Sequence, residues 1–110
     1  MNPDKHKDIT SVYLFGNKRL NYYKVGIAHN IRTRLSSMTL PFEVKLLSYM
    51  ELPDRASALL VEESLHLRYR RNWVRGEWFK NLLAEQFLPD AEDIATKLCC
   101  EGRIKARADL

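Results

Sequence analysis

The sequence has few of the residues that build cross-linked or membrane-spanning proteins. Its only two cysteines, Cys99 and Cys100, are adjacent. Neighbouring cysteines form a strained disulfide, and two thiols without clustered histidines make a poor zinc site, so we expect reduced thiols. No apolar run reaches the roughly 18 residues of a membrane span, and the polar start MNPDKHKD is unlike a secretory signal. We therefore expect a soluble, cytoplasmic protein with no membrane partner.

A strong excess of one charge is also missing. Lysine and arginine number 18 against 14 acidic residues, a net charge of +4 that is compatible with nucleic acid without demonstrating it. The 110 residues are enough for one modest core. We expect a flexible arm over residues 1–10 and a folded domain over residues 11–88. A C-terminal helix and charged tail over residues 89–110 would pack on or beside that domain.

Two β-rich runs lie close together near the start of the chain. Residues 11–15, SVYLF, and residues 21–26, NYYKVG, flank a turn-like GNKR segment, which is typical of a β-hairpin. The hairpin would place Tyr13 and Lys24 on neighbouring strands, where cross-strand side chains can meet. We expect the turn cations Lys18 and Arg19 to contact nucleic acid.

Helical spacing follows from about Asn30 to Met38, with Asn30 as N-cap. Ile31, Leu35 and Met38 mark a buried stripe. Arg34 falls on the flank of that stripe and can lean over the hairpin. The alternative is that the methylene groups of Arg34 pack on the core while its guanidinium group stays in water, a purely structural role.

A third strand is expected over residues 44–52, and Pro53-Asp54 then opens the longest helix, which would run to about Arg71. Glu62 falls within an apolar face of this helix, whereas Glu63 points to solvent. A buried carboxylate needs a partner, either an arginine that serves only the fold or a metal ion. The other members of the predicted face are Leu59, Leu65, His66 and Tyr69.

A basic run with interleaved aromatic residues ends this helix. It is typical of a surface that binds a phosphate backbone, although cations also favour the negative end of a helix in purely structural roles. The predicted phosphate-binding residues here are Arg68, Arg70, Arg71 and Arg75. In the following GEWF segment, we expect Trp78 and Phe79 to be core residues rather than base-stacking platforms.

The remainder is expected to be helical. Residues 81–87 predict a short helix, Pro89-Asp90 begins a last one that ends near Gly102, and residues 103–110 are a charged tail. The element order β-β-α-β-α-α predicts a small α+β domain, with a three-stranded, mostly antiparallel sheet flanked by helices.

Four segments in this order resemble the GIY-YIG endonuclease superfamily. Residues 11–13, SVY, stand where that family has GIY, and residues 24–26, KVG, stand where it has YIG. Arg34 lies at the place of the family's catalytic arginine, and Glu62 at that of its metal-binding glutamate. With the closing GEWF, the chain looks most like a small phage and bacterial subgroup. It departs from the family pattern at three places. Lys24 replaces a tyrosine, and Met38 stands where the family often has tyrosine or histidine. The late asparagine of many members has no counterpart, since Asn72 and Glu77 only lie in the same region.

This resemblance implies a metal-dependent endonuclease, acting on DNA more than on RNA, with Mg²⁺ or Mn²⁺ on Glu62. Arg34 would bind the non-bridging phosphate oxygens. Tyr13 would orient or deprotonate the attacking water, with Lys24 stabilising its phenolate. His66, one turn from Glu62, is a further catalytic candidate.

Little of the chain remains for reading base edges, so weak sequence specificity is expected. One active site cuts one strand, so duplex cleavage would need a homodimer, a partner protein or two successive encounters. Two other classes of function stay open: a catalytically inactive nucleic-acid-binding module of the same fold, and a small phage-type protein-interaction factor.

Overall fold

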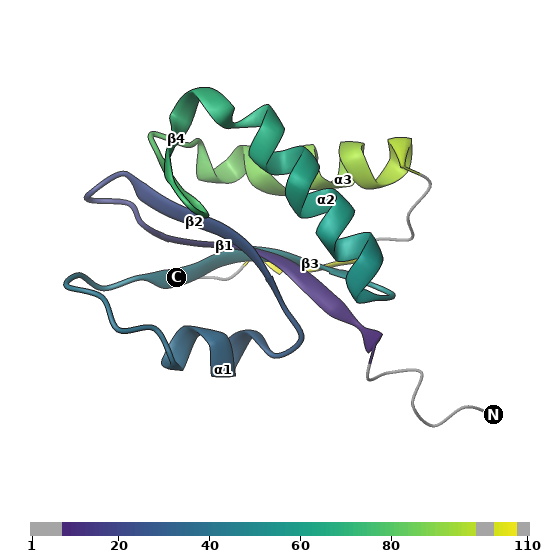
Figure 1. Ribbon diagram of the computed structural model, residues 1–110, viewed down its shortest axis with the longest axis horizontal. Helices are drawn as coiled ribbons and strands as arrows, with labels where there is room; N and C mark the ends of the chain where they lie inside the picture. The colour runs from purple at the N-terminus through teal and green to yellow at the C-terminus, as the bar shows by residue number, and fades with distance from the viewer. Residues whose placement is uncertain (1–7, 99–102, 108–110) are drawn as a thin grey trace.

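The computed structural model describes residues 8–98 and 103–107. The cysteine pair, the predicted helix end near Gly102 and most of the predicted N-terminal arm lie outside these residues. The described chain forms one antiparallel sheet of six strands, in the order β4-β5-β2-β1-β3-β6 (Figure 1). The strands are β1 (Thr10–Asn17), β2 (Tyr22–Ala28), β3 (Lys45–Leu52), β4 (Trp73–Arg75), β5 (Trp78–Lys80) and β6 (Arg103–Arg107). The predicted three-stranded sheet is therefore wrong.

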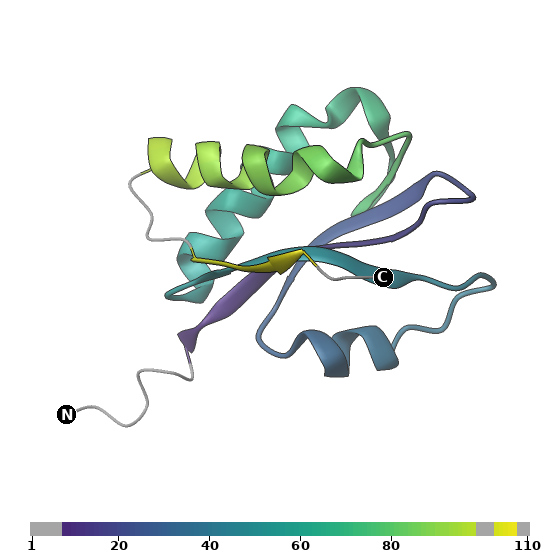
Figure 2. The same cartoon turned by 180° about the vertical axis from the view of Figure 1, so that it is seen from behind.

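Helices cover both faces of the sheet. Helices α2 (Arg55–Arg68) and α3 (Phe87–Lys97) lie on one face, and α1 (Ile31–Ser36) lies on the other, as the front and back views agree (Figures 1 and 2). The alternation of side chains along β1 matches these two layers. Val12 and Leu14 enter the main core beneath α2 and α3. Tyr13 and Phe15 enter a smaller cluster, to which α1 contributes partly buried side chains.

The hairpin predicted at the start of the chain is confirmed. Strands β1 and β2 pair antiparallel, with Tyr13 opposite Gly26 and Phe15 opposite Lys24. The turn is closed by Asn17, whose side-chain oxygen accepts a hydrogen bond from the amide of Leu20 at 3.0 Å. Asparagine tolerates such local bonds and left-handed backbone better than most residues, which is why it recurs in tight turns.

The predicted starts of α1 and α2 are also confirmed, whereas α3 begins at Phe87 and not at Pro89-Asp90 as predicted. The Asn30 side chain accepts from the amide of Thr33 at 3.0 Å, and Asp54 accepts from the amide of Ser57 at 2.7 Å. These N-cap bonds satisfy amides that have no partner within the helix. Each cap thereby fixes where its helix begins relative to the sheet.

The buried face of α2 differs from the predicted one. It consists of residues spaced i, i+3, i+4 and i+7, namely Ala58, Val61, Glu62 and Leu65. Leu59, one residue from Ala58, is 39% exposed, because one residue turns the helix by about 100°. The helix ends at Arg68 and a short 3-10 turn, η2 (Arg70–Asn72), follows it, so the predicted extension to Arg71 is wrong.

The C-terminal third contains less helix than expected. Residues 81–87 include only a 3-10 turn, η3 (Ala84–Gln86), and the last described helix ends at Lys97. Residues 103–107 of the predicted tail instead form β6, which pairs with β3 at the edge of the sheet. In the part of the chain that is described, no helix is long and apolar enough to cross a membrane.

Candidate functional site

The candidate site lies where β5 ends beside β2. Strand β5 pairs with β2 only over Tyr22–Lys24, and the amide of Val25 then donates to the Glu77 carbonyl at 3.0 Å. Beyond this point α2 approaches the edge of β2. His66 Nε2 donates to the Val25 carbonyl at 2.8 Å, which fixes that nitrogen as the protonated one. The structure thus gives His66 a contact that positions β2.

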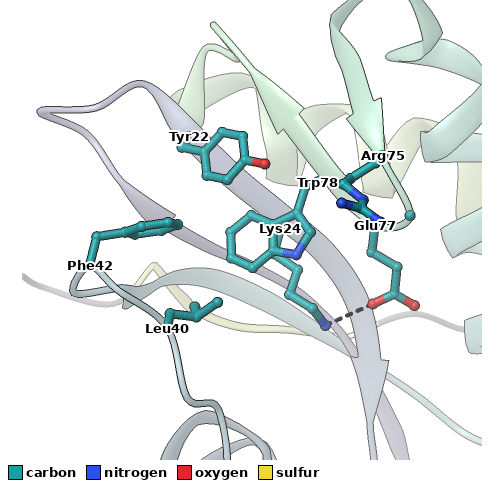
Figure 3. Close-up of a pocket in the computed structure, with 8 residues that line it drawn as sticks. Tyr22, Lys24, Leu40, Phe42, Arg75, Glu77 and Trp78 are labelled. Atoms are coloured by element: carbon teal, nitrogen blue, oxygen red, sulfur yellow. Dashed lines mark hydrogen bonds and ion pairs between the residues drawn. The ribbon is translucent and has the colours of Figure 1, made fainter.

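Tyr13, Lys24 and Glu77 form a hydrogen-bonded chain. Lys24 Nζ donates to Tyr13 Oη at 2.7 Å. It also donates to Glu77 Oε1 at 2.7 Å (Figure 3). Tyr13 and Lys24 meet because the residue opposite Tyr13 is Gly26, two positions from Lys24 on the same face. Burial lowers the pKa of Lys24, but its bonds to Glu77 and Tyr13 outweigh this and raise the pKa above its usual range. Lys24 is therefore a fixed positive charge at neutral pH.

Glu62 adds a buried carboxylate to this chain. Its residue is 7% exposed, and no partner for Oε2 is found among the described residues. The pKa of Glu62 is raised to about 7, mainly by burial and then by the charge and hydrogen bond of the neighbouring Glu77 carboxylate, while Lys24 opposes the shift. The four side chains of Tyr13, Lys24, Glu62 and Glu77 are called the carboxylate–lysine cluster below.

Glu77 is the member of the cluster that sequence reasoning did not select. It follows Gly76, whose φ of +54° suits glycine, at the turn that joins β4 to β5. The turn returns β5 onto β2 and brings Glu77 next to Lys24. The GEWF segment was the available signal, since a glycine before an acidic residue and two aromatic residues is typical of a hairpin turn entering a strand.

Arg34 is not in contact with the carboxylate–lysine cluster. It lies in the last turn of α1, is exposed, and has no ion pair or side-chain hydrogen bond within the described ranges 8–98 and 103–107. Helix α1 covers the sheet face that carries Tyr13. Arg34 therefore remains a free cation on the same side of the sheet as Tyr13.

The residues predicted to bind nucleic acid fall into two groups. Arg68 is held by Asp90 at 3.1 Å and by Asp93 at 2.9 Å, so it joins α2 to α3. Arg70 donates to the Leu67 carbonyl at 3.1 Å. The rest are exposed side chains in the β1–β2 turn, in η2 and at the end of β4, namely Lys18, Arg19, Arg71 and Arg75.

The family of the chain follows from a match over most of its length. The family model of the T5orf172 domain matches residues 10–97, a range that includes the whole carboxylate–lysine cluster. The chain belongs to the T5orf172 domain family. This finding corrects the family suggested by the motifs, because the T5orf172 domain is a family distinct from the GIY-YIG endonucleases.

The T5orf172 domain is a phage-associated, nuclease-like domain. The carboxylate–lysine cluster is compatible with that description, because carboxylates and a lysine are side chains that can act on a phosphate ester. No curated protein and no solved structure matched the chain.

Proposed function

We propose that this T5orf172 domain is a metal-dependent endonuclease that hydrolyses phosphodiester bonds, in DNA more than in RNA, with weak sequence specificity. The observation that carries the proposal is the carboxylate–lysine cluster itself. A buried Glu62 oxygen without a partner in the described chain lies beside Glu77, and Lys24 supplies a fixed charge next to both. Leaving such a carboxylate buried costs stability, so its retention favours a functional reason.

The residues present fit a divalent cation of the Mg²⁺ or Mn²⁺ type. Mg²⁺ is usually held by one or two carboxylates together with substrate phosphates and waters, and Glu62 and Glu77 are such a pair. No three acidic, histidine or cysteine side chains that could hold a metal come together in the described residues, so binding would depend on substrate. When bound, the ion would supply positive charge to the phosphate and to the departing oxygen.

Lys24 and Arg34 would stabilise the negative charge that develops on the phosphate. An ammonium group has three N–H donors, and two of those of Lys24 are used by Tyr13 and Glu77. The third remains for a phosphate oxygen. Arg34 is exposed on α1, on the side of the sheet that carries Tyr13, and its planar guanidinium group would bind the phosphate of a nucleic-acid strand that lies there.

Tyr13 would first orient the Lys24 ammonium group and then, once substrate is bound, orient or deprotonate the attacking water. Its hydroxyl oxygen accepts from Lys24 and so orients the ammonium group. The Tyr13 residue is 0% exposed, so contact with an attacking water requires the Lys24–Glu77 ion pair to open when substrate binds. The same burial favours a second candidate function, a nucleic-acid-binding module without catalysis, in which the pair stays closed.

Lys24→Met is expected to reduce cleavage by about 100-fold, the size seen when one donor to a developing negative charge is removed. The measurement is cleavage of plasmid and single-stranded DNA with Mg²⁺ or Mn²⁺, with a chelator as blank. Lys45→Met is the matched control, because Lys45 is exposed and lies 3.9 Å from Glu43, away from the cluster. Intact activity in Lys24→Met would contradict the assignment.

A further inference from the structure

A cavity with aromatic walls adjoins the carboxylate–lysine cluster. It has a volume of about 360 Å³, and its lining includes Tyr22, Phe42 and Trp78 together with Lys24, Arg75 and Glu77 (Figure 3). Lys24 belongs to both the cavity and the carboxylate–lysine cluster, since it lines the cavity and its ammonium group contacts Tyr13 and Glu77. A ligand in the cavity would therefore lie directly beside the proposed phosphate position.

The three aromatic rings have a defined geometry. Tyr22 and Trp78 are stacked, with ring centroids 4.9 Å apart and planes 11° from parallel. Phe42 meets both edge to face, with centroids 5.4 Å from Tyr22 and 5.9 Å from Trp78. The rings come from β2, from β5 and from the loop between α1 and β3. Each is only partly buried, so ring surface remains for a flat ligand.

The charges at the cavity exclude one class of ligand that aromatic walls often bind. Cations are attracted to aromatic faces. In the lining of this cavity Glu77 is paired with Lys24 at 2.7 Å, so Arg75 leaves a net positive charge that disfavours a cationic ligand. Arg75 is exposed and has no ion pair within the described part of the chain. The combination favours a flat, uncharged ring that is attached to an anion.

We propose that this cavity binds the unpaired base of a nucleotide whose phosphate lies at Lys24 and Arg75. The inference rests on the proposed function and narrows its substrate to strands with an unstacked base at the cut. A base inside a duplex has both faces covered by its neighbours, so only a single-stranded, looped or extruded base can stack on protein rings. Phe79 is buried as predicted, but Trp78, which follows Glu77, is only partly buried and lines the cavity, so Trp78 would provide the stacking surface.

The two tryptophans of the chain allow a direct test. Trp73→Phe leaves Trp78 as the only tryptophan, so its fluorescence should be quenched by an oligothymidine strand. An abasic strand of equal length and the fully paired duplex should quench much less. Measuring in chelator prevents cleavage, so the result is independent of whether the proposed nuclease activity exists.

Trp78→Ala should weaken binding of the single strand by roughly 10-fold, the effect of losing one stacked base, and leave duplex binding unchanged. Trp78→Phe, which keeps a ring, should recover most of the loss. Leu83→Ala is the control, because Leu83 is 65% exposed and does not line the cavity, whereas Trp73 Nε1 donates to the Gly76 carbonyl at 2.9 Å in the turn that carries Glu77. Equal quenching by the abasic strand, or equal loss of single-strand and duplex binding, would overturn the proposal.

Discussion

Glu62→Gln is expected to make the metal-free protein more stable at pH 8 while it removes catalysis. The pKa of Glu62 is raised from its usual value near 4.5 to about 7, first by burial and then by Glu77. Above pH 7 the folded protein therefore carries an ionised carboxylate that would be better solvated in the unfolded chain. Glutamine has the same shape without the charge, so the substitution removes this penalty.

The sign of the pH dependence follows from proton binding. Between about pH 4.5 and pH 7 the folded protein holds a proton on Glu62 that the unfolded chain releases, so stability falls as pH rises through this window. Glu62→Gln should flatten that fall. We expect a gain in the free energy of unfolding of about 2 kcal/mol at pH 8, and little difference at pH 4.

Urea denaturation in the presence of chelator, at pH 4, 6 and 8, measures this effect. Glu63→Gln is the matched control, since Glu63 is the exposed neighbour of Glu62 on the same helix and should show no comparable change with pH. A destabilised Glu62→Gln protein at pH 8 would mean that Glu62 has a favourable partner in the folded chain, and would contradict its assignment as an unsatisfied ligand.

Gly26→Ala is expected to disable the carboxylate–lysine cluster. A Cβ at this position would lie 2.7 Å from the Cζ of Tyr13 and 2.8 Å from Glu77 Oε1, both closer than packed atoms allow. Gly26 has no positive φ, so the backbone accepts alanine and the effect is one of crowding alone. We expect at least a 10-fold loss of cleavage, since small displacements of catalytic groups are costly, and a loss of stability of about 1–3 kcal/mol.

Gly16→Ala separates crowding at the cluster from crowding elsewhere. A Cβ at Gly16 would lie 2.5 Å from the ring of Tyr23 and 2.8 Å from a methyl group of Leu47, and none of its three nearest atoms belongs to the cluster. Gly16→Ala should therefore cost similar stability but leave cleavage by the folded protein unchanged. Equal cleavage rates for the two folded variants would show that the position of Tyr13 does not matter for activity.

Local sequence patterns were sufficient to predict the part of the site that is formed by residues close together in sequence. The hairpin between β1 and β2 could be predicted from its turn residues, and it brings Tyr13 to Lys24. The N-cap residues Asn30 and Asp54 likewise determine where α1 and α2 begin. Glu62 could be placed on a buried helix face from spacing alone.

Long-range pairing was not predictable in the same way. Strands β4 and β5 have three residues each, too few for an alternating pattern. Glu77 enters the site only because β5 pairs with β2. Strand β6 looked like a charged tail because its partner β3 lies far away in sequence. The motif resemblance also pointed to the wrong family, since short motifs carry less information than a match over residues 10–97.

The most direct test of the central claim is a cleavage assay of the wild type and Glu62→Gln side by side. Single-stranded and plasmid DNA are incubated at pH 8 with Mg²⁺ or Mn²⁺, and with chelator. We expect metal-dependent cutting by the wild type and a cleavage rate at least 100-fold lower in the folded Glu62→Gln protein. Equal cutting by both proteins would contradict the carboxylate–lysine cluster as the active site. Salt-sensitive DNA binding with no cutting by either would contradict the nuclease function and favour the binding module.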